Sequence, residues 1–341
     1  MSAVDGALHD PIERALRPLD RARTWLLRTT MPVSSYFAGA REPRVLLVGI
    51  SVVALSLLGA VLAPLWLLAL GPILIGVPHI LADLRYCVVR TQLHRQRHLA
   101  LLAVPVLVAL SFGAPLELGF VGVAACVLAL RETVSPIRRG AIVAVALGLA
   151  GLARWFGPSA DLFLAHAHNF IAVGLWAVWR PREGRSHLWV LLAFLLASVA
   201  LLAGAADFTW QAGLSAGLPT GLSAEVHARS LAPGLGEPWA LRLVLLYCFA
   251  QSVHYGVWLR LVPEEDRDRP TPRTFRASYE AVCAELGRPV VLGFALATLA
   301  LAIWACVDLA AARYGYLRFV RFHGVLELGA FALILARGRR R

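Results

Sequence analysis

Two apolar stretches of the sequence pair a histidine with a carboxylate one helical turn later. In GPILIGVPHILADLRYCVVR, His79 is followed by Asp83, and in FVRFHGVLELGAF, His323 is followed by Glu327. Residues at i and i+4 share one face of an α-helix, so each pair can present an imidazole and a carboxylate to the same point. Such a pair suits two metal ligands, or one ligand and the group that orients it. Pro78 stands just before the first pair and is expected to bend its helix there.

Two further apolar stretches carry histidines of their own. LAHAHNF contains His166, His168 and Asn169, and FAQSVHYGVW contains Gln251 and His254. His166 and His168 are separated by about 200° around a helix, so they cannot both face one centre. We predict that His168 is the ligand, because its depth matches that of the other histidines. We expect His166 to pair with Asn169 at i+3.

The four stretches place their histidines at similar depths. Counted from the cytoplasmic ends of the segments at about 1.5 Å per residue, the histidines lie about 14–21 Å deep. The hydrocarbon core of a bilayer is about 30 Å thick, so they form one layer near its middle. The alternative is a structural network of interhelical hydrogen bonds. The predicted metal ligands are His79, His168, His254, His323 and Glu327, supported by Asp83, His166, Asn169 and Gln251.

The elements that must position these side chains are long apolar helices. The chain has 341 residues, is 59% hydrophobic and has a mean hydropathy of +0.68. Backbone groups inside a bilayer must be paired, and the near absence of strand-like alternation favours helices over a barrel. We therefore predict an all-α, polytopic integral membrane bundle of about eight to ten transmembrane helices. The candidate spans are 45–62, 65–88, 98–113, 116–131, 140–155, 159–179, 187–206, 239–260, 289–310 and 314–336, of which the third to fifth could also be two helices.

The net charge of +12 is carried by arginine, since the chain has no lysine. Most arginines fall in alternate connections between the apolar stretches. An N-terminus inside the cell places each Arg-rich connection on the cytoplasmic side, which predicts an N-in/C-in topology. No soluble segment is long enough for a nucleic-acid-binding domain, so no nucleic-acid partner is expected. We expect the bacterial inner (cytoplasmic) membrane as the location.

The chain divides into two parts. Residues 1–44 are predicted to form a cytoplasmic segment with an interfacial amphipathic helix, which begins near Asp10-Pro11. Residues 45–341 are predicted to form one transmembrane domain. A long outer loop, 206–238, is rich in Gly, Ser and Pro and could act as a lid. A cytoplasmic loop, 261–288, is expected to form a short helix from Thr274.

The residue types at the predicted site favour transition-metal chemistry. Neutral imidazole with carboxylate suits Fe, Zn, Cu or Ni rather than Ca or Mg, and iron with open positions supports O₂ chemistry. We predict an oxygenase or related oxidoreductase that binds Fe(II) and acts on an apolar lipid or polyene, with membrane lipid and an apolar small molecule as partners. Another first-row metal or haem is the alternative cofactor. A bis-histidine cytochrome using His79 and His254, or a transporter with His and Glu as a relay, are the alternative functions.

Two segments also resemble a known family. GVPHILADLRY resembles the Gly-x-Pro-His-Gly-Ala-x-Asp-His segment of the bacterial Brp/Blh β-carotene dioxygenase family. YCFAQSVHYGVW (Tyr247–Trp258) is similar to a later histidine-bearing helix of that family. The resemblance implies a polytopic, iron-dependent enzyme that cleaves β-carotene to retinal with intramembrane histidines. It carries over to His79 with Asp83 and, through the second segment, to His254.

Overall fold

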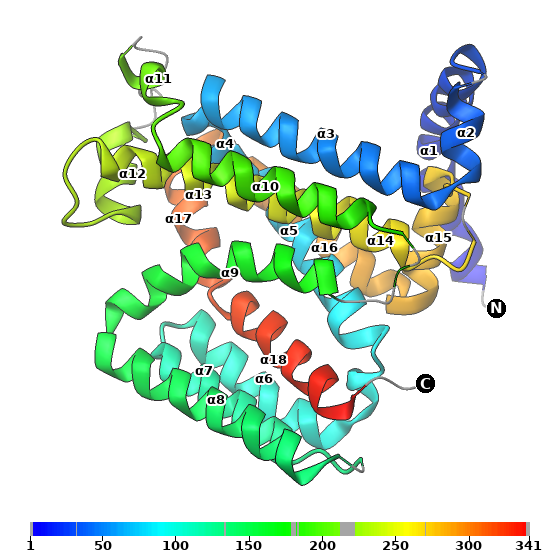
Figure 1. Cartoon of the computed structure of the whole chain (residues 1–341). Helices are drawn as coiled ribbons and strands as arrows, with labels where there is room; N and C mark the ends of the chain where they lie inside the picture. Colours follow the sequence, from blue (N-terminus) through cyan, green and yellow to red (C-terminus); the bar gives the residue numbers. More distant parts are fainter. Residues whose placement is uncertain are drawn as a thin grey trace.

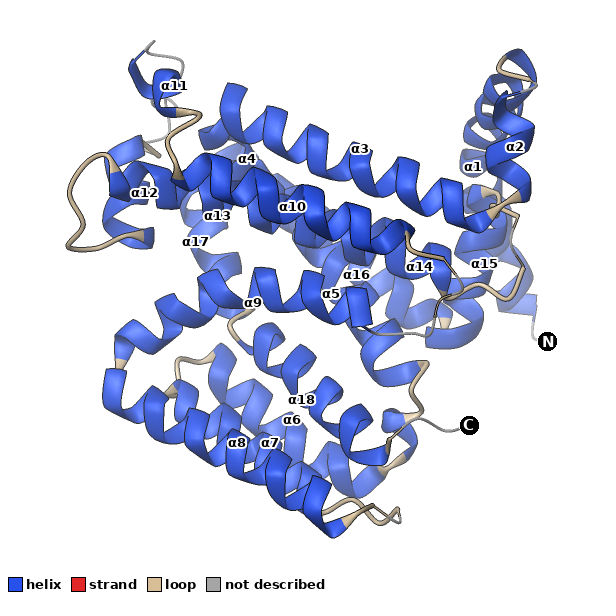
Figure 2. Cartoon of the chain, viewed as in Figure 1, coloured by secondary structure: helices blue, strands red, loops and turns tan. Residues whose placement is uncertain are grey.

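The structure is a computed structural model, and it describes residues 3–31, 33–132, 134–178, 182, 184–211, 222–269 and 271–338 (Figure 1). These residues form helices joined by short connections, and this part of the chain contains no strand (Figure 2). The predicted all-α class is therefore confirmed.

Each of the predicted spans coincides with an apolar helix or a run of joined helices, so the protein is a polytopic helical membrane protein. Seven are long and apolar enough to cross a membrane. The region 97–156 holds three helices and not two. The seven are α3 (Arg41–Leu62), Pro64–Val89, α8 (Pro136–Phe156), α9 (Pro158–Val178), Trp239–Glu265, α16 (Arg288–Val307) and Leu309–Arg337. The shorter apolar helices are α6 (Arg97–Ser111), α7 (Leu116–Leu128) and α10 (Ser186–Leu202).

Three of the long runs are not uniform helices. Pro64–Val89 consists of α4 (Pro64–Gly71), a π-helical segment η1 (Pro72–Gly76), α5 (Val77–Asp83) and a second π-helical segment η2 (Leu84–Val89). Trp239–Glu265 consists of α13 (Trp239–Gly256), the π-helical segment η4 (Val257–Leu261) and α14 (Val262–Glu265). Leu309–Arg337 is broken at 320–321 into α17 (Leu309–Phe319) and α18 (Phe322–Arg337). π-Helical segments therefore lie on both sides of α5, the helix that contains Pro78.

The two termini lie at the same end of the bundle (Figure 1). The helices of the predicted outer loop, α11 (Asp207–Gln211) and α12 (Ala224–Leu231), lie at the opposite end from α15 (Phe275–Leu286), which belongs to the predicted cytoplasmic loop (Figure 1). This arrangement agrees with the predicted sides of the two loops. Residues 212–221 of the proposed lid lie outside the described residues.

The N-terminal segment lies across the end of the bundle where both termini are found. It comprises α1 (Ala3–Thr29) and α2 (Val33–Gly39), and α1 packs against α15. Asp20 accepts hydrogen bonds from the backbone N–H groups of Phe275 and Arg276 and thereby caps α15. Thr274 caps the same helix by accepting from Ala277 N, so α15 begins where the sequence predicts.

Ion pairs join the ends of several helices on the side of the bundle where α15 lies. The Arg85 guanidinium donates to both oxygens of Glu285 at 2.9 Å, which joins η2 to α15. Glu265 accepts hydrogen bonds from Arg182 at 2.5 and 2.7 Å and from the Trp176 indole at 2.7 Å. These contacts fix the ends of α9 and α14 relative to each other, and so hold the helices that carry two of the histidines.

Candidate metal centre

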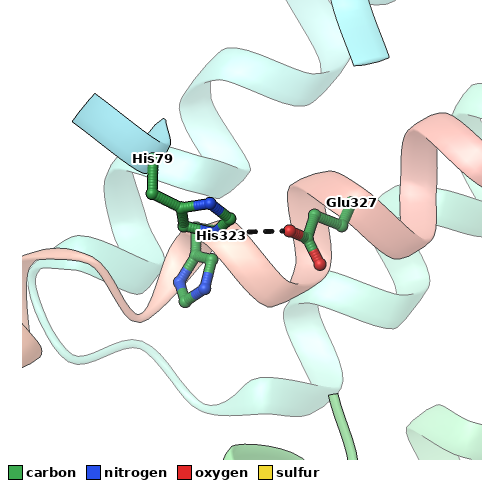
Figure 3. Close-up of side chains that lie close together, drawn as sticks. All are labelled: His79, His323 and Glu327. Carbon is green, nitrogen blue, oxygen red and sulfur yellow. Dashed lines mark ion pairs between the residues drawn. The ribbon is translucent and has the colours of Figure 1, made fainter. Parts of the chain in front are cut away.

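The histidines of α5 and α18 meet the carboxylate of Glu327 inside the bundle. Figure 3 shows His79 and His323 beside each other with the Glu327 carboxylate directed towards them. One ligand atom from each of these three residues lies within 4.8 Å of the other two. Nε2 of His79 is 3.6 Å from Oε1 of Glu327. The group is buried and has the composition of a metal site, so it could hold a metal ion.

The histidines of α9 and α13 join this group. The ring centroids of His79 and His254 are 4.6 Å apart, and His168 lies 5.1 Å from His254 and 4.9 Å from His323. His79 and His254 lie 5.7 and 6.3 Å from His323. Imidazoles bound to one ion would place their centroids roughly 4.5–6.5 Å apart. The structure therefore brings all five predicted ligands into one cluster, which we call the histidine–carboxylate cluster.

Asp83 lies at the edge of the cluster and is completely buried. Its Oδ2 is 3.4 Å from Nε2 of His79, so the carboxylates of Asp83 and Glu327 flank the same nitrogen. Neither oxygen of Asp83 and neither nitrogen of His79 makes a hydrogen bond of standard geometry in the described chain. Burial of polar atoms without partners is costly. These atoms fit a site that is completed by a metal ion.

Backbone carbonyls orient two of the imidazoles. Nδ1 of His323 is 2.8 Å from the Val320 carbonyl oxygen, and Nδ1 of His168 is 3.0 Å from the Ala165 carbonyl oxygen. A carbonyl oxygen only accepts hydrogen bonds, so Nδ1 must carry the proton in both rings. Their Nε2 atoms therefore present lone pairs, which is the form of histidine that binds metal.

Asn169 orients the third imidazole. Its Nδ2 donates to the Ala165 carbonyl at 3.0 Å, which places its Oδ1 3.0 Å from Nδ1 of His254. Because this oxygen is an acceptor, Nδ1 of His254 must donate, and its Nε2 must be a lone pair. That Nε2 lies 3.2 Å from Oε1 of Glu327. Two acceptors that face each other in a buried site require a cation between or beside them, either a proton or a metal ion.

Two of the predicted supporting residues bond to groups outside the set of predicted ligands. The expected pair of His166 with Asn169 is wrong, because Nε2 of His166 lies 2.8 Å from the Leu231 carbonyl and Asn169 is used by His254. Gln251 donates to the Tyr247 hydroxyl at 3.2 Å. His166 and Gln251 thus form hydrogen bonds outside the histidine–carboxylate cluster.

The backbone around the cluster departs from regular α-helix. α5, which carries His79 and Asp83, lies between two π-helical segments, and η4 begins just after the α13 turn that contains His254. π-Helical segments are frequent at functional sites. The Val320 carbonyl that orients His323 lies at the break between α17 and α18. This oxygen could not be predicted from the sequence, because no residue type near position 320 signals the break.

An apolar groove runs beside the cluster, between α5, α6, α16, α17 and α18. Its volume is about 940 Å³. Ile80 and Phe322, the neighbours of His79 and His323 in the sequence, line it. Tyr316 and Val320 also line the groove. A smaller apolar cavity of about 190 Å³ shares the Leu84 side chain with the groove.

The cluster does not suit haem at the pair of histidines expected for it. With their rings 4.6 Å apart, His79 and His254 leave no room for a macrocycle between them. A mononuclear or otherwise compact ion remains the cofactor that the donor set fits. Comparison of the chain with protein families, with curated proteins and with solved structures finds no match.

Proposed function

We propose that this protein is a membrane metalloenzyme that binds a redox-active first-row metal, iron in the first instance, and oxidises an apolar substrate. One observation carries the proposal: ligand atoms of His79, His323 and Glu327 converge within 4.8 Å of one another in a buried group, and the acceptor Nε2 of His254 also faces Glu327. A shared proton would relieve one such contact, whereas a metal ion would relieve them all. The bound metal would supply the redox chemistry and the activation of O₂.

The residues at the site have two roles in this proposal. His79, His168, His254, His323 and Glu327 hold the ion, and the hydrogen bonds at Nδ1 orient the rings of His168, His254 and His323 before it binds. Asp83 lies beside His79 and adds a second negative charge. Two carboxylates offset the charge of a divalent cation, which matters because an uncompensated charge is expensive in a low dielectric.

The groove supports an apolar substrate that enters from the bilayer. Its volume lies within the range of small-molecule sites. One wall is α16, whose outward side chains Leu296, Leu299 and Ile303 are exposed and would face lipid. The resemblance of GVPHILADLRY to the Brp/Blh family makes β-carotene the first substrate to test.

Metal analysis of the purified protein, combined with an assay, tests the proposal. The wild-type protein should contain iron without a Soret band and should consume O₂ when β-carotene is supplied. His254→Ala should lose both metal and activity, whereas His166→Ala should keep both, because His166 bonds outside the cluster. A folded wild-type protein that binds no first-row metal would overturn the proposal. Solute movement in liposomes without metal would favour the transporter instead.

A further inference from the structure

A buried arginine lies in α17, outside the histidine–carboxylate cluster. The sequence places Arg313 in a connection on the outer side, but the structure places it inside α17, where only 3% of its surface is exposed. A charged side chain in a membrane-spanning segment is costly and normally has a partner or a function. Arg313 therefore needs an explanation that the cluster does not provide.

No carboxylate forms an ion pair with Arg313 among the described residues. Its Nε donates to the Leu68 carbonyl oxygen at 2.8 Å, and its guanidinium lies 5.4 Å from the ring centroid of Tyr314. No other hydrogen bond of this guanidinium is found in the described part of the chain. A neutral carbonyl and a ring face do not neutralise the charge, so its Nη groups remain available to a ligand.

The surroundings of Arg313 combine polar groups with apolar walls. Tyr247 and Tyr255 of α13 and His227 of α12 lie within electrostatic range of its guanidinium. His227 is completely buried: Nδ1 donates to the Ser223 carbonyl at 2.8 Å, and Nε2 has no hydrogen-bond partner in the described chain. Burial and, to a lesser extent, the charge of Arg313 lower the pKa of His227 despite its backbone hydrogen bond, so the imidazole is neutral. The site thus has one positive charge and one unfilled acceptor.

The apolar walls come from α4 and α17. Leu65 and Ala69 of α4 pack with Leu222, and Leu309 and Ala310 of α17 pack against them. Leu68, whose carbonyl holds Arg313, belongs to the same helix as Leu65 and Ala69. A ligand at Arg313 therefore meets a cationic group with hydrocarbon beside it, which suits the acidic end of an apolar molecule.

We propose that Arg313 is the centre of a binding site for a carboxylate, at the end of the bundle that is covered by α12. The planar guanidinium fork matches the two oxygens of a carboxylate, and this geometry makes arginine the preferred residue for such ligands. The neutral His227 can accept a hydrogen bond from a water molecule that is bound to the carboxylate. The carboxylate comes either from a small free acid or from the acid end of an apolar chain.

The position of the site has a consequence for the substrate, and this consequence rests on the proposed function. Tyr247 precedes His254 by about two turns of α13, which corresponds to about 10 Å along the helix. Tyr255 lies near both sites, since its ring is 5.1 Å from that of His79 and it is within electrostatic range of the Arg313 guanidinium. An acidic apolar substrate bound at Arg313 would extend from there towards the metal cluster.

Equilibrium binding of radiolabelled octanoate to the full-length protein in non-ionic detergent tests the site. The measurement is made on chelator-treated protein, so its result is independent of the metal and of the proposed function. Octanoate should bind saturably, and octan-1-ol at the same concentration should not displace it. Arg313→Met should weaken binding at least about tenfold, because a charge-assisted hydrogen bond is lost. Arg318→Met is the matched control on the exposed face of the same helix and should bind as the wild type does.

A competition measurement with acetate identifies the source of the carboxylate. A second variant of Arg313 keeps the test valid if the first variant does not fold. Acetate that displaces octanoate at equal concentration would identify a small free acid, and acetate that fails to do so would identify the acid end of a chain. If Arg313→Met does not fold, Arg313→Lys keeps the charge but loses the fork, and it should bind octanoate several-fold more weakly. The proposal is overturned if the wild type shows no saturable octanoate binding, or if the folded Arg313 variant binds octanoate unchanged.

Discussion

The side-chain oxygen of Asn169 lies 3.0 Å from Nδ1 of His254 and sets the proton on that ring. The amide is itself held by the Ala165 carbonyl, so the lone pair of His254 Nε2 is fixed towards Glu327. A residue outside the histidine–carboxylate cluster thus determines which nitrogen of His254 can bind a metal. This hydrogen bond joins α9 to α13, two helices that are far apart in the sequence.

Asn169→Leu should lower metal affinity by about 10–100-fold, because the orienting partner of a ligand histidine is lost. Metal content after dialysis against a series of chelator concentrations measures the effect. Gln251→Leu is the matched control, since it removes a buried amide that bonds to Tyr247 instead. Equal affinity in the wild type and Asn169→Leu would show that Asn169 does not orient a ligand.

His79→Ala should abolish metal binding and activity while the protein stays folded in the membrane. Asp83→Asn should lower metal affinity by about 10–100-fold if Asp83 orients His79. Elemental analysis of the two purified variants, with His166→Ala as control, gives the answer. If both variants keep a full complement of metal, the pair has a structural role only.

Glu327→Gln should impair metal binding without destabilising the metal-free fold. The substitution keeps the shape of the side chain but supplies an N–H donor to the acceptor Nε2 of His254. We expect the metal-free variant to be at least as stable as the metal-free wild type, and we expect added metal to raise the Tm of the wild type alone. A metal-induced rise in Tm that survives in Glu327→Gln would argue against Glu327 as a ligand.

The contact between Arg85 and Glu285 should make stability depend on pH. Burial favours a higher pKa for Glu285, but its hydrogen bond to Arg85 and the charges of Arg85, Arg90 and Arg273 outweigh burial, and the net pKa is lowered. A lowered pKa in the folded state stabilises the protein above the unfolded pKa, and this stabilisation is lost as the pH falls through the folded pKa.

Glu285→Gln should therefore reduce stability at neutral pH by about 1 kcal/mol, and the difference should shrink below about pH 4.5. Thermal unfolding between acidic and neutral pH checks this expectation. Glu280→Gln on the same helix is the control, since its pair with Arg276 is exposed. A difference between Glu285→Gln and the wild type that does not change with pH would contradict it.

Cysteine labelling tests the N-in/C-in topology. In a Cys306→Ala background, which removes the exposed native thiol, Asp268→Cys should be labelled only from the cytoplasmic side and Gly236→Cys only from the outside. Position 236 follows α12 and position 268 precedes α15, and these two helices lie at opposite ends of the bundle (Figure 1). Labelling of position 268 from outside intact cells would show that the orientation is the reverse of the predicted one.

The local features of this protein could be predicted from the sequence. Hydrophobic stretches predicted every apolar helix, because a backbone in lipid must satisfy its own hydrogen bonds. Helical periodicity predicted that His79 and Asp83 share a face, as do His323 and Glu327, and the structure places the members of the first pair 3.4 Å apart. Depth along the helices predicted that four histidines occupy one layer.

Tertiary structure alone decided the partners within that layer. Periodicity within one helix gives no information on how that helix is rotated against its neighbours. The expected pair of Asn169 with His166 therefore does not form, and Asn169 is hydrogen-bonded to His254 instead. The helix break that presents the Val320 carbonyl to His323, and the burial of Arg313, also depend on packing between helices. The sequence by itself therefore determined the helices and the residues they carry at each depth. The rotations of those helices, which only their mutual packing decides, determined which atoms meet.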